Sequence, residues 1–110
     1  MGLRDFFAAL CNFPSVAELS RQVAQRSYSL VRESVGIHVL AYSRAEARGY
    51  VRAKAGAVIR AEARYVAQRH PSLGRTALAH VISQASDRVV QSVLADLNRE
   101  RARRSVSRAA

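Results

Sequence analysis

Residues 43–69 read SRAEARGYVRAKAGAVIRAEARYVAQR, and the organisation of the whole chain follows from this segment. It is rich in alanine, the strongest helix former, and it contains no proline. Ser43 and Glu46 have the spacing of a capping box, and Pro71 disfavours helical geometry at His70. The sequence therefore predicts one uninterrupted helix, roughly 40 Å long at about 1.5 Å per residue.

This predicted helix is apolar on one side and basic on the other. Its seven Arg and Lys residues against two Glu give it +5 of the chain's formal +10. At 100° per residue, a core stripe is predicted along one side: Ala47, Val51, Ala55, Val58 and Tyr65, flanked by Tyr50, Ile59 and Val66. The opposite side carries Gly49, Arg52, Ala53, Gly56, Ala57, Arg60 and Arg64.

Small residues at four-residue spacing on the basic side have two interpretations. Close packing of another helix is the first, through Gly49, Ala53, Gly56 and Ala57. Contact with a phosphate backbone is the second, with arginines closing around it. Two glycines each cost about 1 kcal/mol of helix propensity relative to alanine, so we expect a partner to offset that cost.

Shorter helices are predicted before the long one. Residues 3–11 have apolar residues at helical spacing, and Pro14 ends that segment. Ser15 and Glu18 then form a second capping box, opening a helix that runs to about Val35 and ends on Gly36 in the left-handed conformation. Its buried side is predicted to contain Leu19, Val23, Ala24, Ser27, Leu30 and Val31.

Residues 37–42 (IHVLAY) are ambiguous from sequence alone. β-Branched and aromatic residues suit a strand, but one chain offers no second strand, so a sheet would need a two-stranded ribbon across a dimer. We favour a buried connector or a helical continuation through Gly36.

The C-terminal part predicts a second long helix, with Ser72 or Ser83 as a possible cap. Its apolar positions recur at intervals of three and four: Leu78, Val81, Ile82, Ala85, Val89, Val93, Leu94 and Leu97. This seam is either the antiparallel partner of the central helix or a dimer contact. The prediction is an all-α fold: a small helical bundle as one domain over residues 1–100, followed by a basic tail over 101–110 that frays.

Composition points to polyanions. The 110 residues carry 17 arginines, one lysine and eight acidic residues, and the pI is 11.4. Such a balance attracts nucleic acid or acidic lipid, although a GC-rich genome would also raise the arginine content. Cys11 stands alone, so the chain has no internal disulfide. No apolar run is long enough to span a membrane, no signal peptide is expected, and a cytoplasmic protein is predicted.

No arrangement of side chains predicts catalysis. The three histidines form no metal-ligand pair, and catalytic triads, paired carboxylates and phosphate loops are missing. We therefore expect a non-enzyme without metal, cofactor or small-molecule substrate. The predicted function is binding of DNA or RNA through phosphates, as a homo-oligomer; the alternative is a structural or adaptor protein. The candidate nucleic-acid contacts are Arg44, Arg48, Arg52, Lys54, Arg60, Arg64, Arg101, Arg103 and Arg104.

Overall fold

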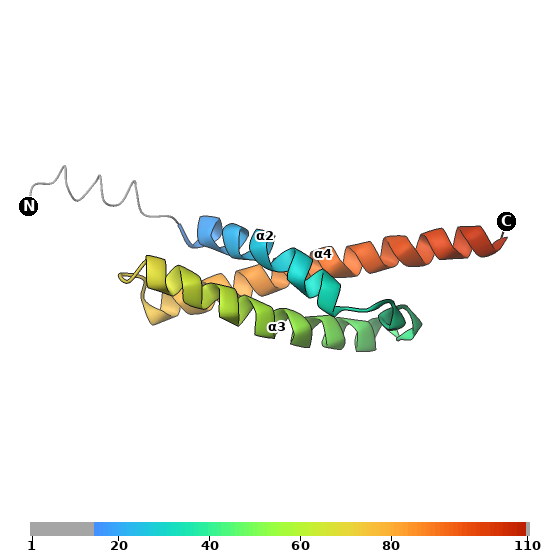
Figure 1. Ribbon diagram of the computed structural model, residues 1–110, viewed down its shortest axis with the longest axis horizontal. Helices are drawn as coiled ribbons and strands as arrows, with labels where there is room; N and C mark the ends of the chain where they lie inside the picture. Colours follow the sequence, from blue (N-terminus) through green and yellow to red (C-terminus); the bar gives the residue numbers. More distant parts are fainter. Residues whose placement is uncertain (1–14, 110) are drawn as a thin grey trace, which may run out of the picture.

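A computed structural model describes residues 15–109, which contain three α-helices, one 3-10 helix and no strand. In chain order the elements are α2 (Val16–Ser34), η1 (Ile37–Ala41), α3 (Arg44–Arg69) and α4 (Arg75–Ala109). The predicted all-α bundle, in which a long basic helix packs antiparallel to a C-terminal helix, is confirmed (Figure 1). The helix predicted over residues 3–11 and the lone Cys11 lie outside the described residues.

Serine caps set the starts of α2 and α3, as predicted. The Oγ atoms of Ser15 and Ser43 accept hydrogen bonds from the backbone N–H groups of Glu18 and Glu46, each at 3.1 Å. α4 begins at Arg75 instead of after Ser72 or Ser83, and the Gly74 carbonyl accepts from the Leu78 N–H at 3.0 Å. The turn between α3 and α4 therefore takes only residues 70–74.

The segment between α2 and α3 is a short 3-10 helix, which corrects two expectations. Val35 and Gly36 are extended, so α2 does not continue through Gly36. Gly36 has φ −70°, outside the left-handed region. A Cβ there would lie 2.7 Å from Nδ1 of His38, so any other residue at this position would make the His38 ring move. Val39 is buried and Ile37 is 65% exposed, so the connector is only partly buried.

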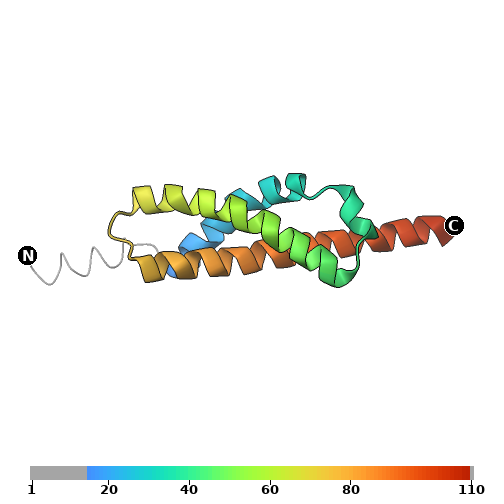
Figure 2. The same cartoon turned by 90° about the horizontal axis from the view of Figure 1, so that it is seen from below.

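Each helix buries a row of residues four positions apart, to which α2 adds Ser20 and Ala24 and α4 adds Val90. A four-residue step turns a helix about 40° beyond a full turn, so each buried row winds slowly around its helix. Rows of this kind pack into one another when helices cross at about −50°. Figure 2 shows α2 and α3 crossing obliquely above α4. The rows are Leu19, Val23, Ser27 and Val31 in α2; Ala47, Val51, Ala55, Ile59 and Ala63 in α3; and Val81, Ala85, Val89, Val93 and Leu97 in α4.

Two predicted core residues are on the surface. Tyr65 is 61% exposed and Leu30 is 46% exposed, whereas Ala63 is buried at 1%. On a fixed 100° wheel Tyr65 has the same direction as Ala47, five turns earlier. The buried row has turned by about 160° between Ala47 and Ala63, so the core no longer lies on that side. A single straight stripe was therefore the wrong template for α3.

The end of α4 is helical and extends beyond the other helices (Figures 1 and 2). Residues 101–109 belong to α4, so the predicted boundary at residue 100 falls inside a helix, and fraying of this end stays a prediction. Pairs one turn apart support this region: Arg99 binds Asp96, while Glu100 binds Arg103 at 3.8 Å and Arg104 at 3.3 Å. Such pairs each stabilise a helix by about 0.2–0.5 kcal/mol. The predicted seam packs within the chain, as the antiparallel partner of α3.

Candidate nucleic-acid interface

Five of the predicted contact residues form one row along α3. Arg44, Arg48, Arg52, Arg60 and Arg64 recur every four residues, and Gly56 takes the remaining place in the row. Four of them come one position after a buried residue, and Arg44 comes four positions before Arg48. The arginine row therefore runs beside the buried row and about 100° away from it. All five side chains are exposed. The arginine row winds with the buried row, by about 40° per step and about 200° from Arg44 to Arg64, so these charges follow a slow spiral over most of the helix.

None of these arginines has an ion-pair partner among the side chains of residues 15–107. The ion pairs found there are all within α4, between Asp96 and Arg99 and between Glu100 and Arg103 or Arg104. Glu62, two positions before Arg64, makes no salt bridge with these side chains. Unpaired charges of one sign along a row create a positive potential that attracts anions. The α3 row is therefore a basic surface without compensating carboxylates among the described side chains.

Lys54 lies outside the arginine row, next to an aromatic cluster. Its Nζ is 5.5 Å from the centre of the Tyr50 ring, within the range of a cation–π contact. The rings of Tyr42, Tyr50 and His38 pack edge to face, with centres 5.4–5.8 Å apart. This cluster joins η1 to the first half of α3. Lys54 is exposed and adds a charge on the far side of the small residues from the arginines.

The predicted helix-packing residues lie on the open side of α3. Gly49, Ala53 and Ala57 are exposed and Gly56 is half-buried. A Cβ built on Gly49 would meet nothing within 4 Å, and one on Gly56 would meet only the guanidinium of Arg60, at 3.7–3.9 Å. No described part of this chain therefore packs on the strip. Packing there stays a prediction for a partner outside the chain.

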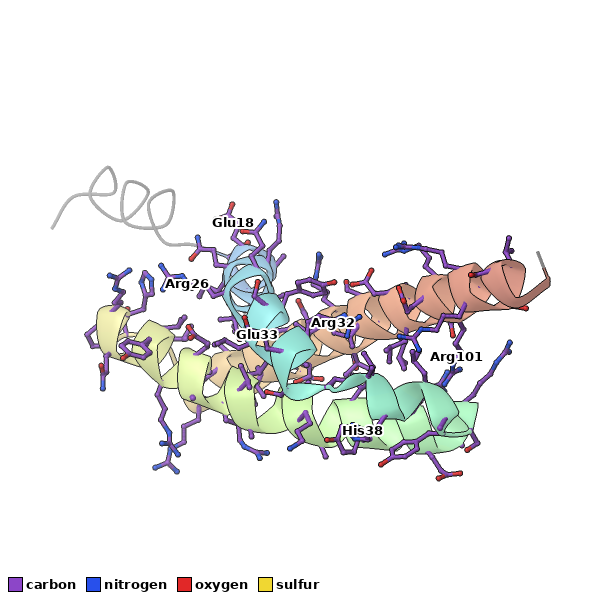
Figure 3. All side chains as sticks on the ribbon, turned by 45° about the vertical axis from the view of Figure 1, so that its right-hand side comes forward. Glu18, Arg26, Arg32, Glu33, His38 and Arg101 are labelled. Carbon is purple, nitrogen blue, oxygen red and sulfur yellow. The ribbon has the colours of Figure 1, made fainter. Side chains whose placement is uncertain are left out.

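The three predicted arginines near the end of α4 have different surroundings from those on α3. The Arg101 Nη2 donates to the backbone carbonyls of Tyr42 and Val39, at 3.2 and 3.4 Å, and its side chain is half-buried (Figure 3). Arg103 and Arg104 are exposed but share Glu100. Arg101 thus holds η1 against α4, and the charge of the other two is partly neutralised. From the sequence alone these three arginines look alike, because all of them belong to one basic run.

Sequence reasoning missed two basic hollows between helices. The first, a hollow of about 210 Å³ between the start of α3 and α4, is lined by Arg44, Arg48, Asn98 and Arg101 together with apolar residues. Arg21 and Arg88 flank a second hollow of about 490 Å³ between α2 and α4, over a floor that includes Ala24 and Val89. The residues that line each hollow come from segments far apart in the chain. No local sequence pattern could therefore have predicted either hollow.

Comparison with protein-family models, curated proteins and solved structures found no match to this chain. Among the described helices, none is both long and apolar enough to cross a membrane. Over the same residues, no three His, Cys, Asp or Glu side chains come together as metal ligands. The candidate site is thus defined by the arginine row alone.

Proposed function

We propose that this protein binds nucleic acid, DNA or RNA, through backbone phosphates and without strong sequence specificity. One observation carries the proposal: Arg44, Arg48, Arg52, Arg60 and Arg64 form an exposed row without carboxylate partners. Guanidinium groups bind phosphate with two parallel hydrogen bonds, and such contacts position a nucleic acid without reading its sequence. The proposed activity is binding, without catalysis. The cytoplasmic location remains a prediction.

The shape of the row also favours a long polyanion over a small anion. Neighbouring arginines are about 6 Å apart along the helix axis, because four residues rise about 1.5 Å each, and Arg52 and Arg60 are about 12 Å apart across Gly56. Gly49, Ala53 and Ala57 beside the row have almost no side chain, so a phosphate backbone can approach the helix closely. A single small anion would engage one or two of these arginines, whereas a polymer engages the series.

Salt dependence of binding tests this proposal. If five phosphates are neutralised, the slope of log K against log salt is about −4.5 for duplex DNA and about −3.5 for a single strand. Affinity then falls roughly 500-fold for duplex, or roughly 130-fold for a single strand, between 50 and 200 mM salt. Absence of binding to duplex, single-stranded DNA and RNA at low salt would refute the proposal.

A pair of double variants with equal charge tests the location of binding. Arg52→Gln with Arg60→Gln removes two charges from the α3 row, and should lower the magnitude of the duplex slope by about 1.8. Arg21→Gln with Arg88→Gln removes the same charge from the hollow between α2 and α4. Equal losses from the two double variants would mean that net charge, and not the α3 row, determines binding.

The alternative function is a structural or adaptor protein that self-associates. The exposed strip of Gly49, Ala53 and Ala57 favours it, because small residues let a second helix approach closely. In that case the wild-type chain sediments as a dimer at micromolar concentration, and Ala53→Leu converts it to a monomer. A monomeric wild-type chain would contradict this alternative.

A further inference from the structure

Tyr65 is an aromatic residue in an unusual position, exposed by 61% beside the end of the arginine row. It lines two separate hollows. One, of about 330 Å³, is formed with Ala61, Arg64 and Gln68 on the outer side of α3. The other, of about 40 Å³, lies toward α2 and includes Arg26 and Arg69. The ring thus stands between two recesses, with arginines on both sides.

We propose that Tyr65 is a stacking platform for an unpaired base, and that the nucleic acid held by the α3 row is single-stranded. This inference rests on the proposed function. Proteins that bind single strands combine a positively charged track with aromatic side chains on which bases stack. Arg60 and Arg64 lead the backbone to this position, and the hollow beside the ring provides space for the base.

The other described aromatic rings are less suited to this role. Tyr42, Tyr50 and His38 direct their edges and faces at one another. Tyr28 is half-buried between α2 and α4, away from the α3 row. Tyr65 is the tyrosine of residues 15–107 with a largely exposed ring, and it is adjacent to a row arginine, Arg64.

The sizes of the two hollows indicate on which side of Tyr65 a base lies. Glu62 lines the narrow hollow on the α2 side, where Arg26 and Arg69 offset its charge. That hollow has a volume of about 40 Å³, against about 330 Å³ for the hollow on the Arg64 side. The base therefore lies on the Arg64 side of the ring, over Ala61 and Gln68.

Stacking on Tyr65 discriminates between single strands and duplexes. In a duplex the bases are paired and stacked on their neighbours, so a surface tyrosine reaches one only after unstacking, which costs a few kcal/mol. An unpaired base in a single strand is available without that cost. Duplex binding, by contrast, needs only the arginines.

The test compares Tyr65 variants on two probes of the same sequence, a labelled single-stranded oligonucleotide and its duplex, by fluorescence anisotropy at low salt. Tyr65→Ala and Tyr65→Leu should weaken single-strand binding roughly five- to 150-fold, and Tyr65→Phe should retain it. Duplex affinity should change less than twofold in all three. Leu30→Ala, which trims an exposed apolar residue on α2, is the control and should leave both affinities unchanged.

Tyrosine fluorescence gives a second readout, because the chain has four tyrosines and no tryptophan. Unlabelled single strand should quench part of the wild-type emission, and this quenching should be absent in Tyr65→Leu. Circular dichroism establishes that each variant is folded.

The outcomes separate the inference from the function on which it rests. Wild-type affinity for single strands in Tyr65→Ala, or equal losses on both probes, would overturn the stacking role while leaving phosphate binding intact. Loss of a wild-type dimer in Tyr65→Ala would overturn it in favour of contact with a second copy. A wild-type chain that binds neither probe at low salt would remove the proposed function itself.

Discussion

Ala55 and Ala53 differ by two positions, and we expect leucine to have opposite consequences at the two sites. Ala55 is 0% exposed and belongs to the buried row of α3, whereas Ala53 is exposed on the other side of the helix. Ala55→Leu inserts three carbon atoms where α2 and α4 pack against α3. Overpacking of a filled core costs about 1–3 kcal/mol. Ala53→Leu adds the same atoms in solvent, and leucine has nearly the helix propensity of alanine.

Thermal unfolding followed by far-UV circular dichroism measures the difference. One kcal/mol shifts the midpoint by about 4–8 °C for a domain of up to 100 residues, so Ala55→Leu should lower it by roughly 4–24 °C. Ala53→Leu should leave it within about 3 °C, since surface changes are usually within 0.5 kcal/mol. An unchanged midpoint for Ala55→Leu would contradict the four-residue packing. A fall in both variants would mean that the strip is covered as well, as the adaptor alternative requires.

Three further substitutions, of Ser27, Ser20 and Arg101, test single polar side chains. Ser27→Ala should leave stability unchanged or raise it by up to about 1 kcal/mol, because the Ser27 Oγ is buried without a hydrogen-bond partner. Ser20→Ala, by contrast, should lower stability by about 1 kcal/mol in urea unfolding, because the Ser20 Oγ donates to the Val16 carbonyl and contacts Gln84 Oε1. Arg101→Met should destabilise by about 1.5–3 kcal/mol, as it removes charge-assisted hydrogen bonds to two carbonyls. Arg103→Met is its control; equal midpoints for the two variants would argue against the role of Arg101.

Local signals in the sequence predicted the starts of α2 and α3 and the end of α3, but not the start of α4. The serines at positions 15 and 43 cap their helices because capping needs only a side chain and a backbone N–H three residues later. The break after Arg69 also follows from local sterics at Pro71. Gly36 was predicted less well: its role depends on the His38 ring two residues later, and the general preference for a left-handed helix end gave the wrong conformation.

Features that depend on how helices cross could not be predicted in the same way. A helical wheel at 100° per residue projects the whole of α3 onto one fixed circle, so it predicts one straight apolar stripe and assigns Tyr65 to the core. The crossing helices instead follow a row that turns, which brings Ala63 inside and leaves Tyr65 outside. Leu30 was wrongly assigned to the buried side of α2 for the same reason.

The same distinction between local and long-range features applies to the candidate site. Exposure of the α3 arginines follows from their positions relative to buried residues of the same helix, so the sequence could identify them. The surroundings of Arg101 depend on carbonyls about 60 residues earlier in the chain, and sequence could not distinguish it from Arg103.

The spacing of the buried rows also bears on how the helices keep their alignment. The α3 row alternates small and large residues: Ala47, Val51, Ala55, Ile59 and Ala63. Sliding α3 by one repeat, about 6 Å, would put valine or isoleucine where alanine packs, an overpacking that costs about 1–3 kcal/mol per site. The core therefore opposes a slide of one repeat, and only a slide of two repeats, about 12 Å, matches small residues with small ones. The connections at the two ends of α3, the five-residue turn before α4 and the anchoring of η1 by Arg101, oppose that longer slide.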